Sequence, residues 1–242
     1  MKKIYGRKPV LEALKSDTGV NQIYLLYNQH SRIINDIKKL AKKKGVRISQ
    51  VSSSKFKTLA PKENTQGIVA EVSEKQLYSL DQMLKDASKK PAPLLLLVDS
   101  VQDPHNLGAI FRTAEAAGVD GIIMSIRNTA PINETVSKTS AGAISHLKIC
   151  REFNLVNVIK TLKKEYYWIV GSKLGNSKNY TEIDFSGPIA LVVGNEEKGI
   201  SHLVAENCDF LAEIPMKGKI QSLNVSVATG ILLFEIIRQR NY

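Results

Sequence analysis

Cysteine and histidine are scarce in this sequence, and their scarcity excludes several kinds of site. The 242 residues include only 2 cysteines, Cys150 and Cys208, and 4 histidines that lie far apart. A disulfide framework or a zinc module built from Cys and His needs more of these residues at closer spacing. We therefore expect neither a bound metal nor a disulfide-stabilised fold.

Long apolar runs are also missing. No stretch of about 18 apolar residues occurs, so we expect no membrane-spanning helix. The first residues, MKKIYGRKPVLEAL, contain two lysines but no apolar region behind them, so we expect no secretory signal. Hydrophobic residues make up 43% of the chain and charged residues 24%, which is typical of globular proteins. These features predict a cytoplasmic protein of one large or two modest domains.

Positive charge is unevenly distributed along the chain. Residues 1–90 carry 19 basic and 8 acidic side chains, whereas residues 91–242 carry 15 of each. The whole net charge of +11 therefore lies in the first third of the chain. Such asymmetry indicates a part that attracts a polyanion, with nucleic acid favoured over an acidic membrane. The alternative is a basic surface that only keeps the protein soluble.

The first 72 residues alternate between strand and helix patterns. Ser31–Lys44 carries an apolar stripe at helical spacing with Ser31 as a possible N-cap, and Gly45 ends it. Short β-branched and aromatic runs predict strands at 21–27, 47–51 and 66–72. Residues 1–72 are therefore predicted to be a small α/β domain.

Residues 73–92 are polar and rich in lysine, which predicts a linker with a short helix near 78–87. Beyond them, residues 93–242 form the second predicted domain. The run Leu94–Asp99 is apolar throughout, as a buried parallel strand would be. Five further strand candidates alternate with helices, at 121–124, 147–150, 167–171, 189–194 and 210–214. This alternation predicts a parallel sheet covered by helices, and the apolar helix 224–238 is predicted to be buried in a core or an interface.

Common nucleotide and hydrolase motifs do not fit this second domain. The segment after the first strand has one glycine, where a dinucleotide fold needs three. Gly194–Ser201 mimics the spacing of a phosphate loop, but Ile200 occupies the position of the essential lysine. No G-x-S-x-G turn of a serine hydrolase occurs.

Three polar segments follow strand-like runs in this domain, and each has two interpretations. Arg112 lies on a helix face lined by small residues, where it is either solvated or close to another surface. Glu196 lies between two glycines and is either a ligand contact or a charged loop residue. Ser222 and Asn224 either cap the last helix or bind a polar ligand. Asn106 lies near the start of its helix, where it can act as a cap.

Together the three segments resemble the signature motifs of the SpoU/TrmH group of S-adenosylmethionine-dependent RNA ribose methyltransferases. Asp103–Gly118 matches D-P-x-N-x-G-x-x-x-R-x-A-x-x-x-G, and Gly194–Gly199 matches G-x-E-x-x-G. Ile214–Ala228 matches I-P-M-x-G-x-x-x-S-L-N-V-S-V-A. With GRKPVLEAL near the start, the resemblance covers nearly the whole chain. The most similar subgroup is that of the RlmB-like enzymes, which methylate the 2′-oxygen of a guanosine in 23S ribosomal RNA.

The resemblance implies an α/β SPOUT domain, which is a parallel sheet with a C-terminal trefoil knot. It also implies a ribosomal-protein-like RNA-binding domain before it, a homodimer formed through the C-terminal domain, and S-adenosylmethionine as cofactor. By motif match, the catalytic and RNA-contacting set is Asn106, Arg112, Glu196, Ser222 and Asn224. The cofactor pocket is implied to include Gly194, Ile214, Met216 and Leu223.

Two questions stay open at this point. Guanidinium groups almost never lose their proton, so Arg112 is either a special base or a stabiliser of the developing alkoxide. The scaffold could also belong to a catalytically silent RNA-binding protein, and transfer RNA is the main rival substrate. The chain departs from many relatives before its last N-terminal strand, where Thr65-Gln66-Gly67 replaces His-Gln-Gly.

Overall fold

A computed structural model describes residues 2–15, 19–60, 65–72, 77–175, 177–219 and 222–240 of the chain. The chain divides into two compact units at residues 76 and 77, apart from residues 131–134, which group with the first unit. Each unit has its own sheet, so the two are described separately below.

The N-terminal unit is built on a four-stranded sheet in the order β1-β4-β2-β3. β2 and β3 are parallel, and β4 runs antiparallel to both β1 and β2. β1, β2 and β3 therefore all point the same way. The elements are β1 (Lys2–Tyr5), α1 (Arg7–Lys15), β2 (Val20–Leu26), α2 (Arg32–Lys43), β3 (Arg47–Val51), α3 (Ser53–Leu59) and β4 (Ile68–Val72).

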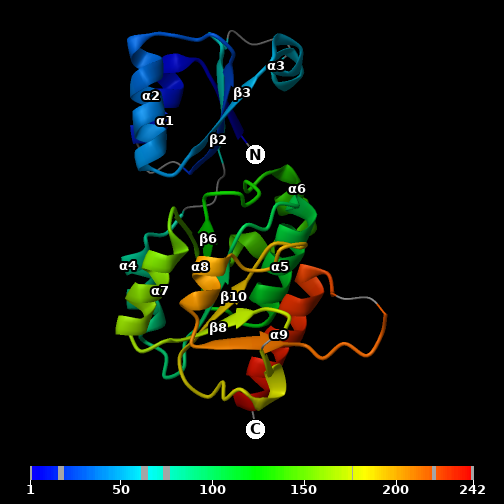
Figure 1. Cartoon of the computed structure of the whole chain (residues 1–242). Helices are drawn as coiled ribbons and strands as arrows, with labels where there is room; N and C mark the ends of the chain where they lie inside the picture. The colour runs from blue at the N-terminus through cyan, green and yellow to red at the C-terminus, as the bar shows by residue number, and fades with distance from the viewer. Residues whose placement is uncertain are drawn as a thin grey trace. The chain divides into compact units, whose positions relative to one another are not determined.

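Helices cover both faces of this small sheet. α1 and α2 lie on one face and α3 lies on the other (Figure 1). The larger core joins Val10 and Ile34 of the two helices to Ile23 and Ile68 of the strands. The amide of Ile34 donates to Oγ of Ser31 at 3.3 Å, which confirms the predicted N-cap of α2.

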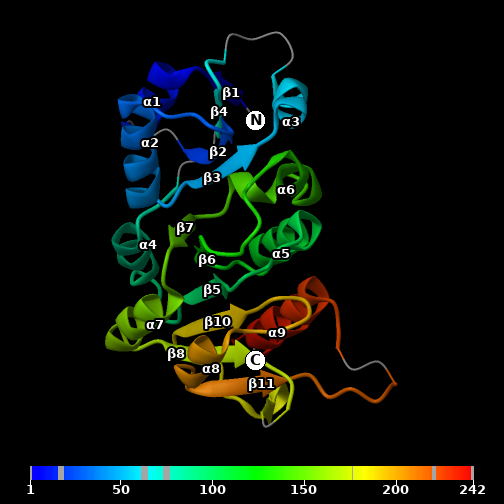
Figure 2. The same cartoon turned by 45° about the horizontal axis from the view of Figure 1, so that its top comes forward.

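The C-terminal unit is built on a seven-stranded parallel sheet in the order β7-β6-β5-β10-β8-β11-β9. Figure 2 shows most of these strands stacked in that order. The strands are β5 (Leu94–Val98), β6 (Gly121–Ser125), β7 (Ile149–Glu152), β8 (Trp168–Ser172), β9 (Lys178–Asn179), β10 (Ile189–Val193) and β11 (Phe210–Glu213). Every residue of β5, β6 and β10 is buried, as their apolar runs predict.

Helices lie on both sides of the parallel sheet (Figure 1). One side carries α4 (Leu80–Ala87), α7 (Leu155–Lys164) and α8 (His202–Glu206). The other carries α5 (Pro104–Ala116), which packs against α9 (Val225–Arg240). The short α6 (Glu134–Thr139) and the 3₁₀ turns Ala143–Ser145 and Tyr180–Glu182 complete the set of named helices. The α/β class with a parallel sheet is thus confirmed.

Three details refine the sequence-based expectations. The predicted linker 73–92 contains α4, whose Met83 is fully buried in the core of the C-terminal unit, while residues 73–76 lie outside the described residues. The strand expected at 147–150 lies at Ile149–Glu152. Helix α9 is buried on one side only, because Val227 and Phe234 are 50% and 51% exposed. The trefoil knot stays a prediction.

Candidate active site

The three motif segments of the C-terminal unit begin at the carboxyl ends of parallel strands. They follow β5, β10 and β11, and all carboxyl ends of a parallel sheet lie at one edge. β5 and β10 are neighbours, and the order of the strands reverses between them. Ligands of open α/β sheets bind in the crevice at such a reversal. The topology therefore brings together segments that lie far apart in the sequence, such as those of Asn106 and Asn224, which are 118 positions apart.

The loop after β10 is closed tightly on itself. Asn195 and Gly199 exchange two backbone hydrogen bonds, of 2.8 and 2.9 Å. A Cβ on Gly194 would lie 2.1 Å from the carbonyl carbon of Gly199, so no other residue fits there without moving the backbone. Gly199 itself has a φ of +67°, in the left-handed region. The two glycines predicted to let the backbone approach a ligand are therefore required by the loop itself.

A chain of side-chain hydrogen bonds links all three motifs. Nδ2 of Asn106 donates to Oε1 of Glu196 at 3.0 Å. Nδ2 of Asn224 in turn donates to Oδ1 of Asn106 at 3.0 Å. Oδ1 of Asn224 accepts from the backbone amide and the hydroxyl of Ser226, at 2.9 and 2.6 Å, in the first turn of α9. We call the side chains of Glu196, Asn106, Asn224 and Ser226 the relay.

The relay has only one possible direction. Asn106 turns its amide nitrogen toward Glu196, whose carboxylate oxygen accepts from it. The carbonyl oxygen of Asn106 then faces Asn224, whose amide nitrogen must donate. At the other end the backbone amide of Ser226 can only donate, which demands the same orientation of Asn224. Both ends agree, so Asn224 acts at once as a helix cap and as a link to Glu196.

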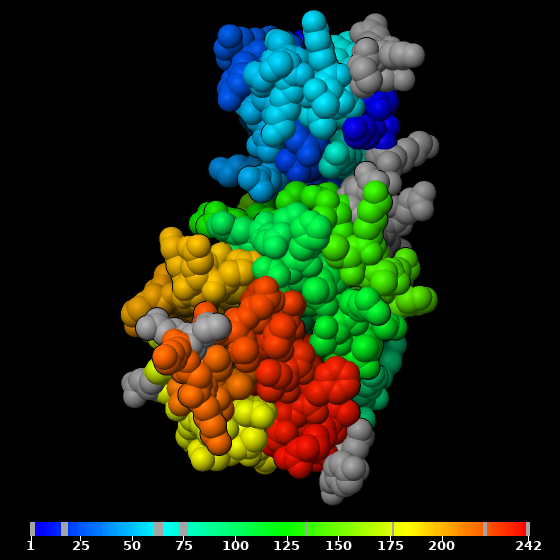
Figure 3. Space-filling model, turned by 90° about the vertical axis from the view of Figure 1, so that its right-hand side faces the viewer, coloured from blue at the N-terminus to red at the C-terminus, as the bar shows by residue number. Residues whose placement is uncertain are grey.

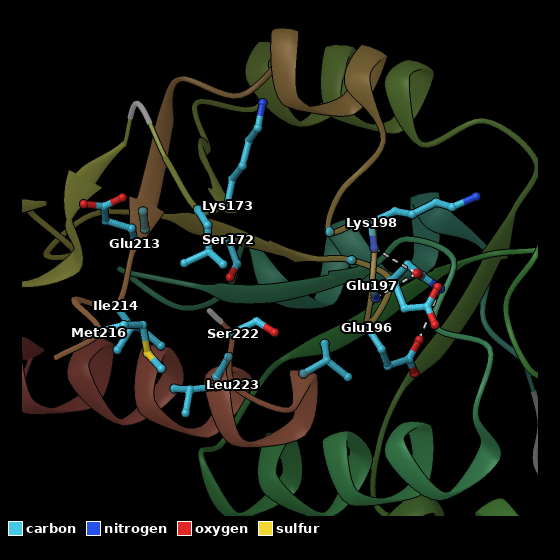
Figure 4. A pocket seen from close by; sticks show the side chains of 17 residues that line it. Ser172, Lys173, Glu196, Glu197, Lys198, Glu213, Ile214, Met216, Ser222 and Leu223 are labelled. Carbon is cyan, nitrogen blue, oxygen red and sulfur yellow. Dashed lines mark hydrogen bonds between the residues drawn. The ribbon is translucent and has the colours of Figure 1, made fainter. Parts of the chain in front are cut away.

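A pocket of about 230 Å³ lies beside the relay. Glu196, Glu197 and Lys198 lie on one side of it, and Ser222 and Leu223 lie on the other (Figure 4). Further lining residues are Ser172, Lys173, Leu174, Gly194, Asn195, Gly199, Ala212, Glu213, Ile214, Met216, Val225 and Ala228. The lining combines apolar side chains with a few polar groups, as is usual for sites of small amphipathic ligands.

The predicted site residues fall into three groups. Six of them line this pocket, namely Glu196, Ser222, Gly194, Ile214, Met216 and Leu223. Asn106 and Asn224 do not line it but reach Glu196 through the relay. Arg112 is exposed on α5 and, among the residues that the structure describes, has neither a hydrogen bond nor an ion pair. Within one copy of the chain, Arg112 therefore joins neither the pocket nor the relay.

Two supporting residues were missed at the sequence level. Nδ2 of Asn195 donates to Oε2 of Glu196 and to the carbonyl oxygen of Ser100, both at 3.1 Å, and so holds the carboxylate against the β5 loop. The buried carboxylate of Asp99 accepts from the backbone amide of Ser201 at 2.8 Å. A polar residue that directly ends an apolar strand was the available signal for Asp99, and the Gly-Asn-Glu order was the signal for Asn195.

Other chemistries find little support in the described residues. Burial is the main cause that raises the pKa of the Cys150 thiol and of the Cys208 thiol to about 12, so both stay protonated near neutral pH. Within the described ranges there is no cluster of three or more potential metal ligands. None of the helices in these ranges is both long enough and apolar enough to cross a membrane.

Family models match both parts of the chain. The model described as "SpoU rRNA Methylase family" matches residues 93–234. The chain belongs to the SpoU family. The model described as "RNA 2'-O ribose methyltransferase substrate binding" matches residues 3–78. This SpoU methylase is therefore an RNA methyltransferase with a substrate-binding domain before its catalytic domain, and the resemblance noted in the sequence is confirmed.

Curated relatives of this SpoU methylase carry matching names. YacO of Bacillus subtilis strain 168, assigned to the TrmH family of tRNA/rRNA methyltransferases, is 38% identical over 98% of this chain and 96% of its own length. A protein of Staphylococcus saprophyticus assigned to the same family is 40% identical over 99% of this chain and 96% of its own length.

Solved structures agree with this assignment. A crystal structure of an AdoMet-bound rRNA methyltransferase from Sinorhizobium meliloti is 28% identical, with a TM-score of 0.63 over 98% of this chain and 86% of the other. The SpoU methyltransferase AviRb of Streptomyces viridochromogenes shares the fold at 24% identity, with a TM-score of 0.64 over 99% of this chain and 90% of the other. The AdoMet bound to the Sinorhizobium meliloti enzyme supports S-adenosylmethionine as the cofactor of this SpoU methylase.

The relay predicts a pH-dependent effect of the Asn106→Asp substitution. The introduced carboxylate would face Glu196 where an amide now donates, so the pair would retain a proton to a higher pH in the folded state. An acid whose pKa is higher in the folded than in the unfolded state makes the fold relatively more stable at low pH. This contribution to stability is lost as the pH rises. We expect the variant to lose about 1–3 kcal/mol of unfolding free energy at pH 8 and clearly less at pH 5, measured by urea denaturation.

Asn106→Ala is the uncharged control: it removes the bond to Glu196 and also the bond that Asn106 accepts from Asn224, but it adds no charge. Its loss should be the same at both pH values. If both variants lose the same free energy at pH 5 and pH 8, the carboxylate of Glu196 does not face residue 106 as described.

Proposed function

We propose that this chain transfers the methyl group of S-adenosylmethionine to the ribose 2′-oxygen of a guanosine in 23S ribosomal RNA. The observation that carries the proposal is the meeting of three motif loops at one edge of the parallel sheet, where the relay lies beside a pocket. The basic N-terminal unit and the names of the relatives support RNA as the substrate.

The pocket suits the methyl donor chemically. Ile214, Met216 and Leu223 offer an apolar surface for its flat base, and Ser172 and Ser222 offer hydroxyls for its polar groups. The tight approach of Gly194 to Gly199 brings backbone groups to the pocket wall in place of a side chain. When bound, this cofactor supplies an electrophilic methyl group on a sulfonium.

The chain's own residues then orient the acceptor. Asn195 and Asn106 hold the two oxygens of Glu196, so this carboxylate is fixed before any substrate binds. Fixed polar groups need no reorganisation during the reaction, and correct placement of two reactants can contribute about 7–11 kcal/mol to lowering the barrier. The relay, with its fixed Glu196 carboxylate, is proposed to position the loops that hold the ribose against the donor.

Arg112 is proposed to act on charge rather than as a base. A guanidinium keeps its proton near neutral pH and binds oxyanions through a planar fork of N–H groups. It can therefore stabilise the alkoxide that develops on the ribose as the 2′-hydroxyl gives its proton to solvent water, or hold the adjacent phosphate.

A homodimer through the C-terminal unit is also proposed. Val227 and Phe234 are half-exposed on α9, whose red surface faces the viewer in Figure 3. Gly230, between these two residues on α9, faces Thr113 of α5, so α5 adjoins this apolar surface. Small and apolar residues on two adjoining helices are typical of an interface between copies of one chain.

The decisive experiment measures tritium transfer from labelled S-adenosylmethionine to a 23S ribosomal RNA transcript. We expect the label in 2′-O-methylguanosine after digestion to nucleosides. The Gly194→Ala variant should reduce both cofactor uptake and transfer to background, because its Cβ has no room. Gly187→Ala is the control, since the nearest atom to its Cβ lies at 4.0 Å.

Other outcomes redirect or refute the proposal. Label found only in transfer RNA would mean that transfer RNA is the substrate. Uptake of cofactor without any transfer would favour a silent RNA-binding protein, and no uptake at all would refute a methyltransferase.

Substitution of Arg112 tests its role. Arg112→Gln should lower the rate of methyl transfer by about a hundredfold or more, the usual size of a lost electrostatic contact in a transition state. Arg112→Lys should recover only part of this rate, because a lysine keeps the charge but not the fork. Cofactor affinity, measured by calorimetry, should stay unchanged in both. Near-full activity of Arg112→Lys would mean that a point charge is sufficient.

The dimer is tested by Phe234→Glu, which puts a charge into the apolar stripe of α9. Analytical ultracentrifugation should give twice the chain mass of 26.8 kDa for the unaltered protein and the single mass for the variant. Lys164→Glu, an exposed charge reversal on α7, should leave the dimer intact. An unaltered protein that sediments as a single chain would refute the dimer.

A further inference from the structure

One edge of the N-terminal sheet gathers several loops. β1, β2 and β3 all end there, and the antiparallel β4 begins there. The loops that follow the three parallel strands therefore meet the turn that precedes β4. As in the catalytic unit, the carboxyl ends of parallel strands are the usual place for a ligand.

Arg7 is held in a fixed position at this edge. Its backbone amide donates to Oε1 of Gln66 at 3.1 Å, and its Nε donates to the carbonyl oxygen of Gln66 at 3.1 Å. Its Nη2 donates to Oε1 of Gln29 at 2.6 Å. A Cβ on Gly67 would lie 2.8 Å from Cδ of Gln29, so the glycine is what lets Gln29 reach across. The guanidinium is thus oriented before any ligand binds.

The hydrogen-bond partners of Arg7 among the described residues are neutral, so none of them compensates its charge. Both oxygens that accept from the guanidinium belong to amide groups, and no ion pair with a carboxylate occurs for Arg7 among the described residues. Its Nη1 group has no hydrogen-bond partner within those residues. An oriented cation with free donors is suited to a phosphate, which a guanidinium binds in bidentate geometry.

An exposed aromatic side chain lies at the same edge. The amide of Leu26 donates to the carbonyl oxygen of Gly67 at 3.0 Å, and the amide of Tyr27 donates to that of Val51 at 3.2 Å. Tyr27 thus directly follows β2, next to the turn that holds Arg7, and it is 54% exposed. Unpaired bases stack on exposed aromatic rings, and such stacking is the common way in which proteins bind single-stranded RNA.

The net charge of this part favours the same ligand. Residues 1–72 carry 15 basic and 5 acidic side chains, a net charge of +10. Most of the lysines are spread over the surface, and several lie on α2 with their side chains exposed. Such lysines attract RNA without selecting a conformation of it, whereas a fixed arginine beside an aromatic ring does select.

We propose that Arg7 and Tyr27 form the contact through which the N-terminal unit binds an unpaired nucleotide of the substrate RNA. Tyr27 stacks on the base, and Arg7 donates to the phosphate. Gln29 and Gln66 hold Arg7 in place. This inference rests on the proposed function, because it takes RNA as the substrate.

The test compares binding of the full-length protein to two fluorescein-labelled probes by anisotropy. One probe is an unstructured 20-nucleotide RNA of mixed sequence, and the other is an RNA duplex of the same length. Arg7→Gln and Tyr27→Leu should each weaken binding of the single strand by about tenfold or more, and Tyr27→Phe should change it little. Arg7→Gln should also lower the slope of the logarithm of the binding constant against the logarithm of salt concentration by about one.

Lys42→Gln on α2 is the matched control, since it removes the same charge from an exposed residue that has no hydrogen bond or ion pair from its side chain in the described part of the chain. It should weaken both probes equally and only about twofold. Arg7→Lys and thermal unfolding curves distinguish the loss of an RNA contact from a disturbed turn. Tyr27→Leu leaves the hydrogen bonds of Arg7 to Gln29 and Gln66 in place. Equal effects of Arg7→Gln and Lys42→Gln on the single strand, or no effect of Tyr27→Leu, would overturn the inference.

Methyl transfer measured in parallel keeps this inference apart from the proposed function. A protein that binds the single strand through Arg7 and Tyr27 but transfers no methyl group would refute the proposed activity alone. Normal transfer with an unchanged KM for RNA in both variants would refute the contact alone.

Discussion

The contact between Gly194 and the backbone of Gly199 is the constraint on which the rest of the catalytic unit depends. It lets the loop after β10 fold back on itself within five residues, and this in turn places Glu196 where Asn106 and Asn195 can hold its carboxylate. Asn224 then ties the start of α9 to the same point. The pocket therefore takes its shape from backbone packing first and from side chains second.

The two units place their oriented polar groups at the same kind of sheet edge, although these groups differ in charge. Each has parallel strands whose carboxyl ends meet at one edge, and each places its oriented polar groups there. In the N-terminal unit the oriented group is a cation with neutral supports, whereas in the C-terminal unit it is a carboxylate held by amides. This difference matches the charge of the two parts, which is strongly positive in one and balanced in the other.

Local patterns in the sequence were sufficient for most of the fold. Apolar runs such as Leu94–Val98 and the striped helix after Ser31 predicted their elements to within a residue or two. The motif match placed Asn106 and Asn224 in one site, but their hydrogen bond could not be predicted, because they are 118 positions apart and neither pattern nor propensity encodes the contact. The half-exposed α9 was also beyond reach, since its apolar residues surround the helix and a buried and an exposed apolar side look alike in one sequence.

The position of β10 in the sheet has a consequence for how this protein matures. β10 is central in space but late in sequence, and its Ile189 pairs with Leu94, 95 positions earlier. Closing so long a loop is entropically costly and slows folding. During synthesis, the edge of β5 that pairs with β10 stays without its partner strand until nearly four-fifths of the chain has emerged from the ribosome. The nascent enzyme is therefore exposed to aggregation at its future centre until β10 arrives.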